Sequence, residues 1–337
     1  MSADETAARN YSSSLAARAA WLHYAAGMTQ AQVAKRLGLS SLKAHRLITR
    51  ANQEGLVRIF VDGEVRECIE LEERLSTRFG LEFCEVVPDF DQDDLPLRAL
   101  GIAGAQFLKR EIDRGDNKLI GVGHGRTLAA SVEYLPRLPA VDMRFVSLFG
   151  GLTRKFAANP HDVIHRLADR TGAQAYVMPV PFFANTVEDR DILLGQRGVS
   201  EVFELALASS LMFVGIGTAE REASLVATGM IELAEIDDVK RDGGVGEVLG
   251  HFFASDGAYV ETGLSSRMIT LGRDQLKDRN IVAIAGGQRK VAAIGSILKS
   301  GYLKGLITDE KTADAVIRET AGTPSANRKP GNGERKA

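Results

Sequence analysis

Three cationic side chains recur on one side of a predicted helix near the N-terminus. Lys43, Arg46 and Arg50 are spaced i, i+3 and i+7, and no acidic residue occurs in this segment before Glu54. Such a face can neutralise DNA phosphates, while short side chains at the start of the helix reach base edges in the major groove. The spacing therefore predicts binding to nucleic acid.

The predicted DNA contacts lie on this helix and on the short helix before it. They are Thr29, Gln30, Lys35, Arg36, Ser40, Ser41, Lys43, His45, Arg46 and Arg50. Ser41, Lys43 and His45 are expected to read base edges, whereas the arginines and Lys35 are expected to contact phosphates. The alternative interpretation is a plain trihelical fragment with a solvated charged face.

Three helices would position these side chains. The pattern predicts helices over residues 19–26, over 29–37, and from 40 or 41 to about 54. Thr29 is a suitable N-cap for the second helix, and Gly38 can end it. The third helix also carries an apolar, core-facing stripe at i, i+3, i+4 and i+7: Ala44, Leu47, Ile48 and Ala51. Residues 56–63 alternate like a strand and end in an Asp-Gly turn, so they predict a wing and a winged helix-turn-helix.

Charge and composition separate this head from the rest of the chain. Residues 1–66 contain nine Lys and Arg against five Asp and Glu, a net of +4, and the remainder contains 33 against 39, a net of −6. The two cysteines have neither metal-site spacing nor a disulfide pattern. No apolar run approaches the roughly 20 residues that span a bilayer, and the polar start does not suggest a secretory signal. We expect a cytoplasmic protein with no membrane partner.

The longer, acidic part alternates strands and helices. Strands are predicted over residues 81–87, 118–123, 143–149, 175–179, 211–217, 281–287 and 306–308, with helices between them. Such alternation predicts an α/β fold with a mostly parallel sheet covered on both faces. We expect a disordered N-terminus (1–14), a helix-turn-helix domain (15–64), an effector-binding and oligomerisation domain (65–321), and a disordered tail (322–337).

Glycine-rich turns follow four of these strands, at residues 121–125, 150–151, 215–217 and 286–287. Ligands bind at the carboxyl ends of strands in open α/β sheets, and helix N-termini there suit anions. Arg126 and Thr127 could complete a cradle for a phosphate or a sugar. Residues 243–247 and 256–257 read as further flexible turns, and four polar side chains near these turns could converge on a polyhydroxylated ligand: Glu247, Asp256, Arg267 and Lys290.

Two motifs suggest cofactors or metals only weakly. The turn at residues 121–125 lacks the G-x-G-x-x-G spacing of a dinucleotide site. His161 and His165 flank Asp162 in a pattern like H-E-x-x-H, but no third metal ligand is evident. We therefore expect no cofactor and no metal.

Several short motifs, in order, resemble one known family. They are residues 29–40, 123–127, 150–151, 179–182, 215–217, 244–247, 252–253, 256–257, 285–287 with Lys290, and 306–310. Together they extend over residues 18–318, and the chain resembles the SorC-type sugar-binding transcriptional regulators. The departures are His124, where the family often has Trp, Ser41, where Arg is common, and His45, where a small polar residue is usual.

The resemblance implies an N-terminal winged helix-turn-helix followed by a Rossmann-like sugar-binding domain of the sugar-phosphate isomerase/deaminase type, acting as a sensor and not as an enzyme. The expected effector contacts are Gly123, His124, Gly125, Arg126, Thr127, Gly150, Gly151, Glu247, Asp256, Arg267 and Lys290. The implied partners are double-stranded operator DNA, a sugar, polyol or sugar-phosphate effector, and further copies in a homodimer or homotetramer. The alternative is a sugar-phosphate isomerase or deaminase carrying a DNA-binding head, with Glu247, Asp256 or Lys290 transferring protons.

Overall fold

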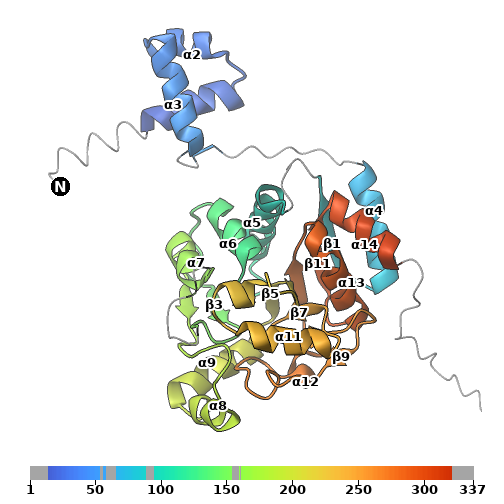
Figure 1. The fold of residues 1–337 in the computed structure, drawn as a ribbon. Coiled ribbons are helices and arrows are strands. Elements are labelled where there is room, and N and C mark those ends of the chain that lie inside the picture. The colour runs from blue at the N-terminus through green and yellow to red at the C-terminus, as the bar shows by residue number, and fades with distance from the viewer. Residues whose placement is uncertain are drawn as a thin grey trace, which may run out of the picture. The chain divides into compact units, whose positions relative to one another are not determined.

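The computed structural model describes residues 14–53, 56–57, 66–88, 95–153, 159 and 161–320. The chain divides into two compact units, residues 1–63 and residues 64–337, which we call the head and the body (Figure 1). Within the described ranges, no helix combines the length and the hydropathy needed to cross a membrane.

The described residues of the head form three helical segments. Residues 14–20 are α-helical and run into a π-helical turn, η1 (Trp21–Ala25), in which Ala26 N donates to Trp21 O at 3.1 Å. The second and third segments are α2 (Gln30–Leu37) and α3 (Ser41–Gln53). Of the predicted wing, residues 58–63 lie outside the described ranges.

Local capping explains where α2 and α3 begin and end. The Thr29 hydroxyl accepts from Gln32 N at 3.3 Å, and Gln32 Oε1 accepts from Thr29 N at 2.8 Å, which completes a capping box. Gly38 ends α2 with φ of 65°, a left-handed conformation that glycine adopts without strain. Ser40 then caps α3, since its hydroxyl accepts from Lys43 N at 3.3 Å. These are the caps that the sequence predicts.

The core of the head forms between these helices. The predicted stripe of Ala44, Leu47, Ile48 and Ala51 is buried, with exposed fractions of 8% or less. It packs with Val33 and with other buried residues of α2 and the first segment. The opposite face of α3 is therefore the one that meets solvent.

A seven-stranded sheet organises the body, in the order β1-β11-β10-β5-β2-β3-β4, with every pair parallel. The strands are β1 (Phe83–Val87), β2 (Leu119–Val122), β3 (Arg144–Ser147), β4 (Gln174–Tyr176), β5 (Leu211–Gly215), β10 (Ile281–Ile284) and β11 (Gly305–Asp309). The predicted mostly parallel sheet is confirmed.

Helices cover both faces of this sheet (Figure 1). One face packs against α5 (Leu97–Arg114), α6 (Arg126–Tyr134) and α7 (Ile164–Thr171). The other packs against α4 (Arg66–Phe79), α9 (Arg197–Ala208), α11 (Leu233–Arg241), α13 (Val291–Ser300) and α14 (Glu310–Thr320). Adjacent strand residues alternate between the two cores, as Leu119 and Ile120 do, because side chains of a strand point to opposite faces.

A second, antiparallel sheet lies between β5 and β10 in the chain. Its order is β6 (Gly217–Thr218), β7 (Gly246–Val248), β8 (His251–Phe253) and β9 (Tyr259–Val260). The remaining elements of the body are α8 (Val187–Leu194), α10 (Ser224–Ala227), α12 (Arg273–Leu276) and the 3-10 helix η2 (Gln288–Lys290). The interpretation of residues 243–247 as a flexible turn is wrong at its end, because Gly246 and Glu247 belong to a buried strand.

Candidate functional site

The outward face of α3 carries the cationic groups of the head. Lys43, His45 and Arg46 are exposed and Arg50 is half-buried. His45 Nδ1 lies 3.2 Å from Gln30 Oε1, so the first turn of α2 positions a side chain near the start of α3. The remaining predicted contacts are exposed too: Thr29, Lys35, Arg36, Ser40 and Ser41.

The polar sides of α2 and α3 face solvent because both helices bury their apolar sides in one core. The two apolar stripes pack against each other, so the polar sides of both helices remain outside. α3 itself contains no acidic residue. A surface with this charge and with the helix N-terminus exposed can follow the phosphates of a duplex while short side chains meet base edges.

The body contains a pocket at the carboxyl ends of β2 and β5. About 720 Å³ of space lies among the lining atoms, and this volume includes space that is open to solvent. Its lining includes the predicted residues Gly123, His124, Gly125, Arg126, Thr127, Glu247 and Lys290. Further parts of the wall come from β6 and from the segment of α10, through Thr218, Ser224 and Thr228.

The N-terminus of α6 supplies one wall of this pocket. Gly125 is the N-cap, with φ of 139°, and the helix begins at Arg126. The amide groups of the first turn have no partner within a helix, so they can donate to an oxygen atom in the pocket. Thr127 instead fixes the turn to the sheet, since its hydroxyl donates to Ile284 O at 3.1 Å.

A buried carboxyl group, that of Glu247, and the half-buried side chain of Lys290 supply another wall. Glu247 Oε1 accepts from Gly250 N at 2.6 Å, and Lys290 Nζ donates to Ile216 O at 2.6 Å. Burial raises the pKa of Glu247 to about 7, although the Gly250 N–H bond and the charge of Lys290 act against this. Burial, with the nearby charge of Arg126, lowers the pKa of Lys290 to about 8. The pocket thus presents one acceptor and one donor, both close to titration at neutral pH.

His124 extends this wall as a neutral group. Asn159 Oδ1 accepts from His161 N at 3.0 Å, which leaves the amide nitrogen of Asn159 to donate to His124 Nδ1 at 2.8 Å. The imidazole proton therefore belongs on Nε2, which lies 4.0 Å from Asp162 Oδ1. Burial lowers the pKa of His124 well below its usual value, so the ring is uncharged at neutral pH.

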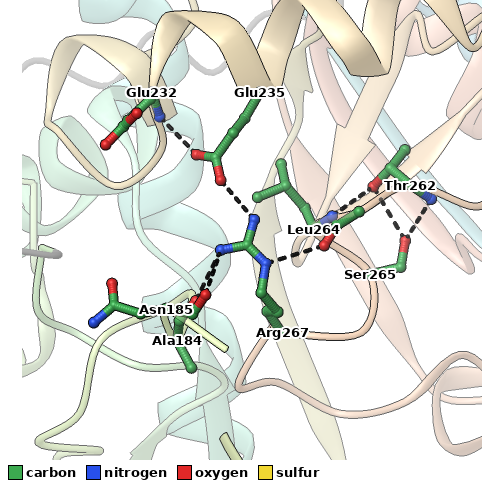
Figure 2. A network of polar contacts seen from close by, with 9 residues as sticks. Ala184, Asn185, Glu232, Glu235, Thr262, Leu264, Ser265 and Arg267 are labelled. Carbon is green, nitrogen blue, oxygen red and sulfur yellow. Dashed lines mark hydrogen bonds and ion pairs between the residues drawn. The ribbon is translucent and has the colours of Figure 1, made fainter. Parts of the chain in front are cut away.

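The expected convergence of Glu247, Asp256, Arg267 and Lys290 is wrong for two of the four. Asp256 is exposed in the turn between β8 and β9, where its carboxylate accepts from Ala258 N at 2.9 Å. Arg267 also lies outside the pocket lining, in the network that Figure 2 shows. The prediction is based on the nearness of these residues to glycine-rich turns in the sequence, which does not determine the direction of a side chain.

Arg267 joins three segments of the body. Its guanidinium donates to Ala184 O at 3.0 Å and to Gly263 O at 3.1 Å, and it pairs with Glu235 of α11 at 2.5 Å (Figure 2). Both partners of this ion pair are only 18% exposed. These contacts position α11 against the segments at 184–185 and 263–267.

Gly150 and Gly151 likewise fall outside the pocket lining. Gly150 N donates to Ile269 O at 3.1 Å, and a Cβ atom there would lie 2.3 Å from Pro181 O. The turn at Gly287 is also filled, because its amide donates to Asp309 Oδ2 at 3.2 Å and Thr312 Oγ1 at 2.7 Å. Two of the four glycine-rich turns therefore serve packing and not the pocket.

Sequence reasoning missed several lining residues. Phe149, Asn159, His161 and Phe182 contribute to the pocket, and Phe149 lies with its ring centroid 4.3 Å from that of His124. His161 is the first residue of the motif that resembles H-E-x-x-H, and Asn159 lies two residues before it. Among the described residues, no three His, Cys, Asp or Glu side chains gather in a way that could hold a metal ion.

Comparison with known proteins agrees with this architecture. The family model Sugar-bind, described as "Putative sugar-binding domain", matches residues 63–318. The erythritol catabolism regulatory protein EryD of Brucella abortus (strain 2308) is 58% identical over 309 residues, which cover 92% of this chain and 98% of that protein. The transcriptional regulator LsrR of Klebsiella pneumoniae subsp. pneumoniae is 33% identical over 309 residues, covering 90% and 92%.

A solved structure extends the likeness through both units. The full-length sorbitol operon regulator SorC from Klebsiella pneumoniae matches with a TM-score of 0.69 at 27% identity, covering 90% of this chain and 98% of that chain. A helix-turn-helix head joined to a sugar-binding α/β body defines a class of transcription regulators that respond to small carbohydrates. The chain belongs to the SorC-type family of sugar-binding transcriptional regulators, as its motifs predicted. It is a sugar- or polyol-responsive regulator of transcription.

Proposed function

We propose that the effector is a small sugar alcohol of the erythritol type, bound in the pocket of the body by Gly123–Thr127, Glu247 and Lys290. The observation that carries this proposal is the presence of a buried acceptor, Glu247, and a half-buried donor, Lys290, in one lining. Each hydroxyl of a polyol both donates and accepts, so it can satisfy both groups. The name of the relative at 58% identity supports the same class of ligand.

A sugar phosphate is the second candidate, and one wall of the pocket favours it. The first-turn amide groups of α6 carry the positive end of the helix dipole, and Arg126 is exposed beside them. A phosphate there would still share the pocket with the carboxyl group of Glu247. Ligand charge is therefore the property that separates the two candidates.

Calorimetric titration of the full chain with erythritol, longer polyols, free sugars and their phosphates tests the effector class. A ligand at 100 times its Kd stabilises the protein by about 2.7 kcal/mol in a parallel thermal unfolding experiment. Glu247→Gln and Lys290→Met should each weaken erythritol binding, whereas Asp256→Asn, outside the pocket, should not. Binding of phosphorylated sugars alone would reject the polyol and retain the pocket.

The head is proposed to bind operator DNA through the outward face of α3 and the start of α2. Lys43, Arg46 and Arg50 would contact phosphates or base edges, with Ser41 and His45 near the bases. The smaller predicted contacts are Thr29, Gln30, Lys35, Arg36 and Ser40. Footprinting on a promoter fragment should show protection that Arg46→Ala reduces, and unchanged protection would exclude this face.

Two copies are needed to present two recognition helices, so we propose a homodimer, or a homotetramer made of two such pairs. The operator should then contain two half-sites separated by about one helical turn or a multiple of it. An effector that prefers one arrangement of the copies would shift the population able to span both half-sites. Light scattering on the purified chain, with and without erythritol, measures the assembly, and a monomer under both conditions would contradict it.

The body is proposed to sense its ligand without converting it. Domain limits of 15–64 for the head and 65–321 for the sensor follow the expectation from the sequence. Glu247 and Lys290 have pKa values that would also suit proton transfer, which is the property that an isomerase or deaminase would use. Incubation with erythritol and with pentose and hexose phosphates should return each compound unchanged, and turnover of any of them would favour the enzyme.

A further inference from the structure

One apolar side chain is exposed at the start of α3. Leu42 is 61% exposed, whereas the other apolar residues of this helix are 8% exposed or less. Leu42 precedes Ala44 by two residues, which is about 200° around a helix of 3.6 residues per turn. It therefore lies opposite the core-facing stripe, on the same side as Arg46 four residues later.

The surroundings of Leu42 restrict what can cover it. Ser41, Lys43, His45 and Arg46 are exposed around it, and α3 carries no acidic side chain. This charge favours a polyanion over an apolar protein surface. On the major-groove edge of DNA, the C5-methyl group of thymine is the apolar group that distinguishes one base pair from another.

We propose that Leu42 reads a thymine methyl group in the major groove and is a specificity-determining residue of this regulator. The inference rests on the proposed placement of α3 in the groove, where residues at the N-terminal end of a recognition helix contact base edges. Arg46 and Arg50 then supply affinity that depends little on sequence, and Leu42 supplies discrimination between thymine and cytosine through an apolar contact.

Removing the methyl group from the DNA and the side chain from the protein tests the same contact from both sides. A duplex selected by the full chain from a random library is scanned by replacing each thymine with deoxyuridine, which keeps the hydrogen-bonding groups and lacks the methyl. The wild-type chain should bind about fourfold more weakly at one thymine in each half-site. Leu42→Ala should bind the thymine duplex more weakly and should lose its sensitivity to uracil at that position alone.

A second exposed leucine of the head provides a matched control. Leu56 is 44% exposed and lies outside α3, so Leu56→Ala should keep the wild-type uracil profile. Leu42→Met, which keeps an apolar side chain, should retain sensitivity at the same thymine. Trp21, the single tryptophan of the chain, reports by fluorescence whether each variant keeps a folded head.

The outcomes separate this inference from the function on which it rests. Absence of any uracil-sensitive thymine, or equal sensitivity in Leu42→Ala and the wild type, would overturn the role of Leu42. If Arg46→Ala still weakened binding on all sequences in that case, DNA binding by α3 would stand. Failure of the wild-type chain to select any duplex would instead reject the DNA-binding face itself.

Discussion

The head and the body both carry ionisable groups, but they hold them in opposite environments. Lys43 and Arg46 lie exposed on the outward face of α3, whereas in the pocket wall Glu247 is buried and Lys290 is half-buried. Solvent ions reach and screen the charges of Lys43 and Arg46, whereas burial shifts the pKa values of Glu247 and Lys290. DNA binding should therefore respond to salt, and the pocket should respond to pH.

The largest expected effect is that of salt on DNA binding. If each of two heads places three cations on phosphates, raising salt from about 50 to about 200 mM should weaken binding about 1000-fold. Arg46→Ala should lower the slope of log affinity against log salt by about one for each phosphate contact removed. Fluorescence anisotropy with a labelled duplex measures both quantities, and erythritol affinity over the same range is the control. If the affinities for DNA and for erythritol depended equally on salt, the proposed difference between the head and the body would be contradicted.

The next effect is the pH dependence of body stability. The pKa of Glu247 rises from 4.5 to about 7 on folding, so its stabilising contribution is present below pH 4.5 and is lost as pH rises through 7. The pKa of Lys290 falls from 10.5 to about 8, so its contribution is present above pH 10.5 and is lost as pH falls through 8. Stability should thus pass through a minimum between about pH 7 and 8, with each limb worth about 3 kcal/mol.

Urea unfolding followed by circular dichroism between pH 5 and 10 measures these limbs. Glu247→Gln should flatten the acidic limb, and Lys290→Met should flatten the alkaline one. The charges of Glu247 and Lys290 interact, so the effects of the two single variants should not simply add. The unfolding free energy of the double variant should depend less on pH than the sum of the two single-variant effects suggests. If neither substitution changed the profile, other ionisable groups would control the pH dependence of stability.

Removal of the Arg267 side chain should have a smaller effect, on the body alone. Arg267→Met removes the ion pair with Glu235 and the hydrogen bonds to the Ala184 and Gly263 carbonyls that Figure 2 shows. We expect a loss of about 2 kcal/mol, below the range of about 3–5 kcal/mol for fully buried pairs, because both partners are partly exposed.

Arg267→Lys, which keeps the charge without the fork, should recover only part of that stability. The shift in unfolding temperature caused by erythritol should be unchanged in both variants, because Arg267 lies outside the pocket lining. Loss of ligand response at unchanged stability would restore Arg267 as an effector contact.

The contrast between the units also explains what the sequence could predict. In the head, helix period, Thr29, Gly38 and Ser40 each act locally, so the helices and their caps could be predicted. In the body, the long buried strands were recognisable because a strand covered on both faces is continuously apolar. The fold class and the turn before α6 follow from such local signals.

The rest of the pocket depends on contacts between distant segments. Strand β7 spans three residues, too few to show a period of two, so Glu247 was assigned to a turn. Asp256 and Arg267 also lie in or near turns, yet neither lines the pocket. Asp256 is exposed in the turn between β8 and β9, and Arg267 pairs with Glu235. Asn159 reaches the pocket through His124, a contact across 35 positions that no spacing rule contains.

The smallest expected effect compares two N-caps of the same type. Thr29 caps α2 through Gln32 N, and Thr186 caps α8 through Asp189 N at 3.0 Å. Each Thr→Ala change should cost about 1 kcal/mol, because one amide group at the helix start loses its acceptor.

The two cap variants should differ in what they disturb. Thr29→Ala should lower the unfolding midpoint reported by Trp21 fluorescence and weaken DNA binding, because the start of α2 holds Gln30 beside His45. Thr186→Ala should lower body stability, followed by circular dichroism, and leave DNA affinity unchanged. If Thr186→Ala weakened DNA binding as much as Thr29→Ala, the head and body would be energetically coupled without any effector, and the route from pocket to operator would have to include α8.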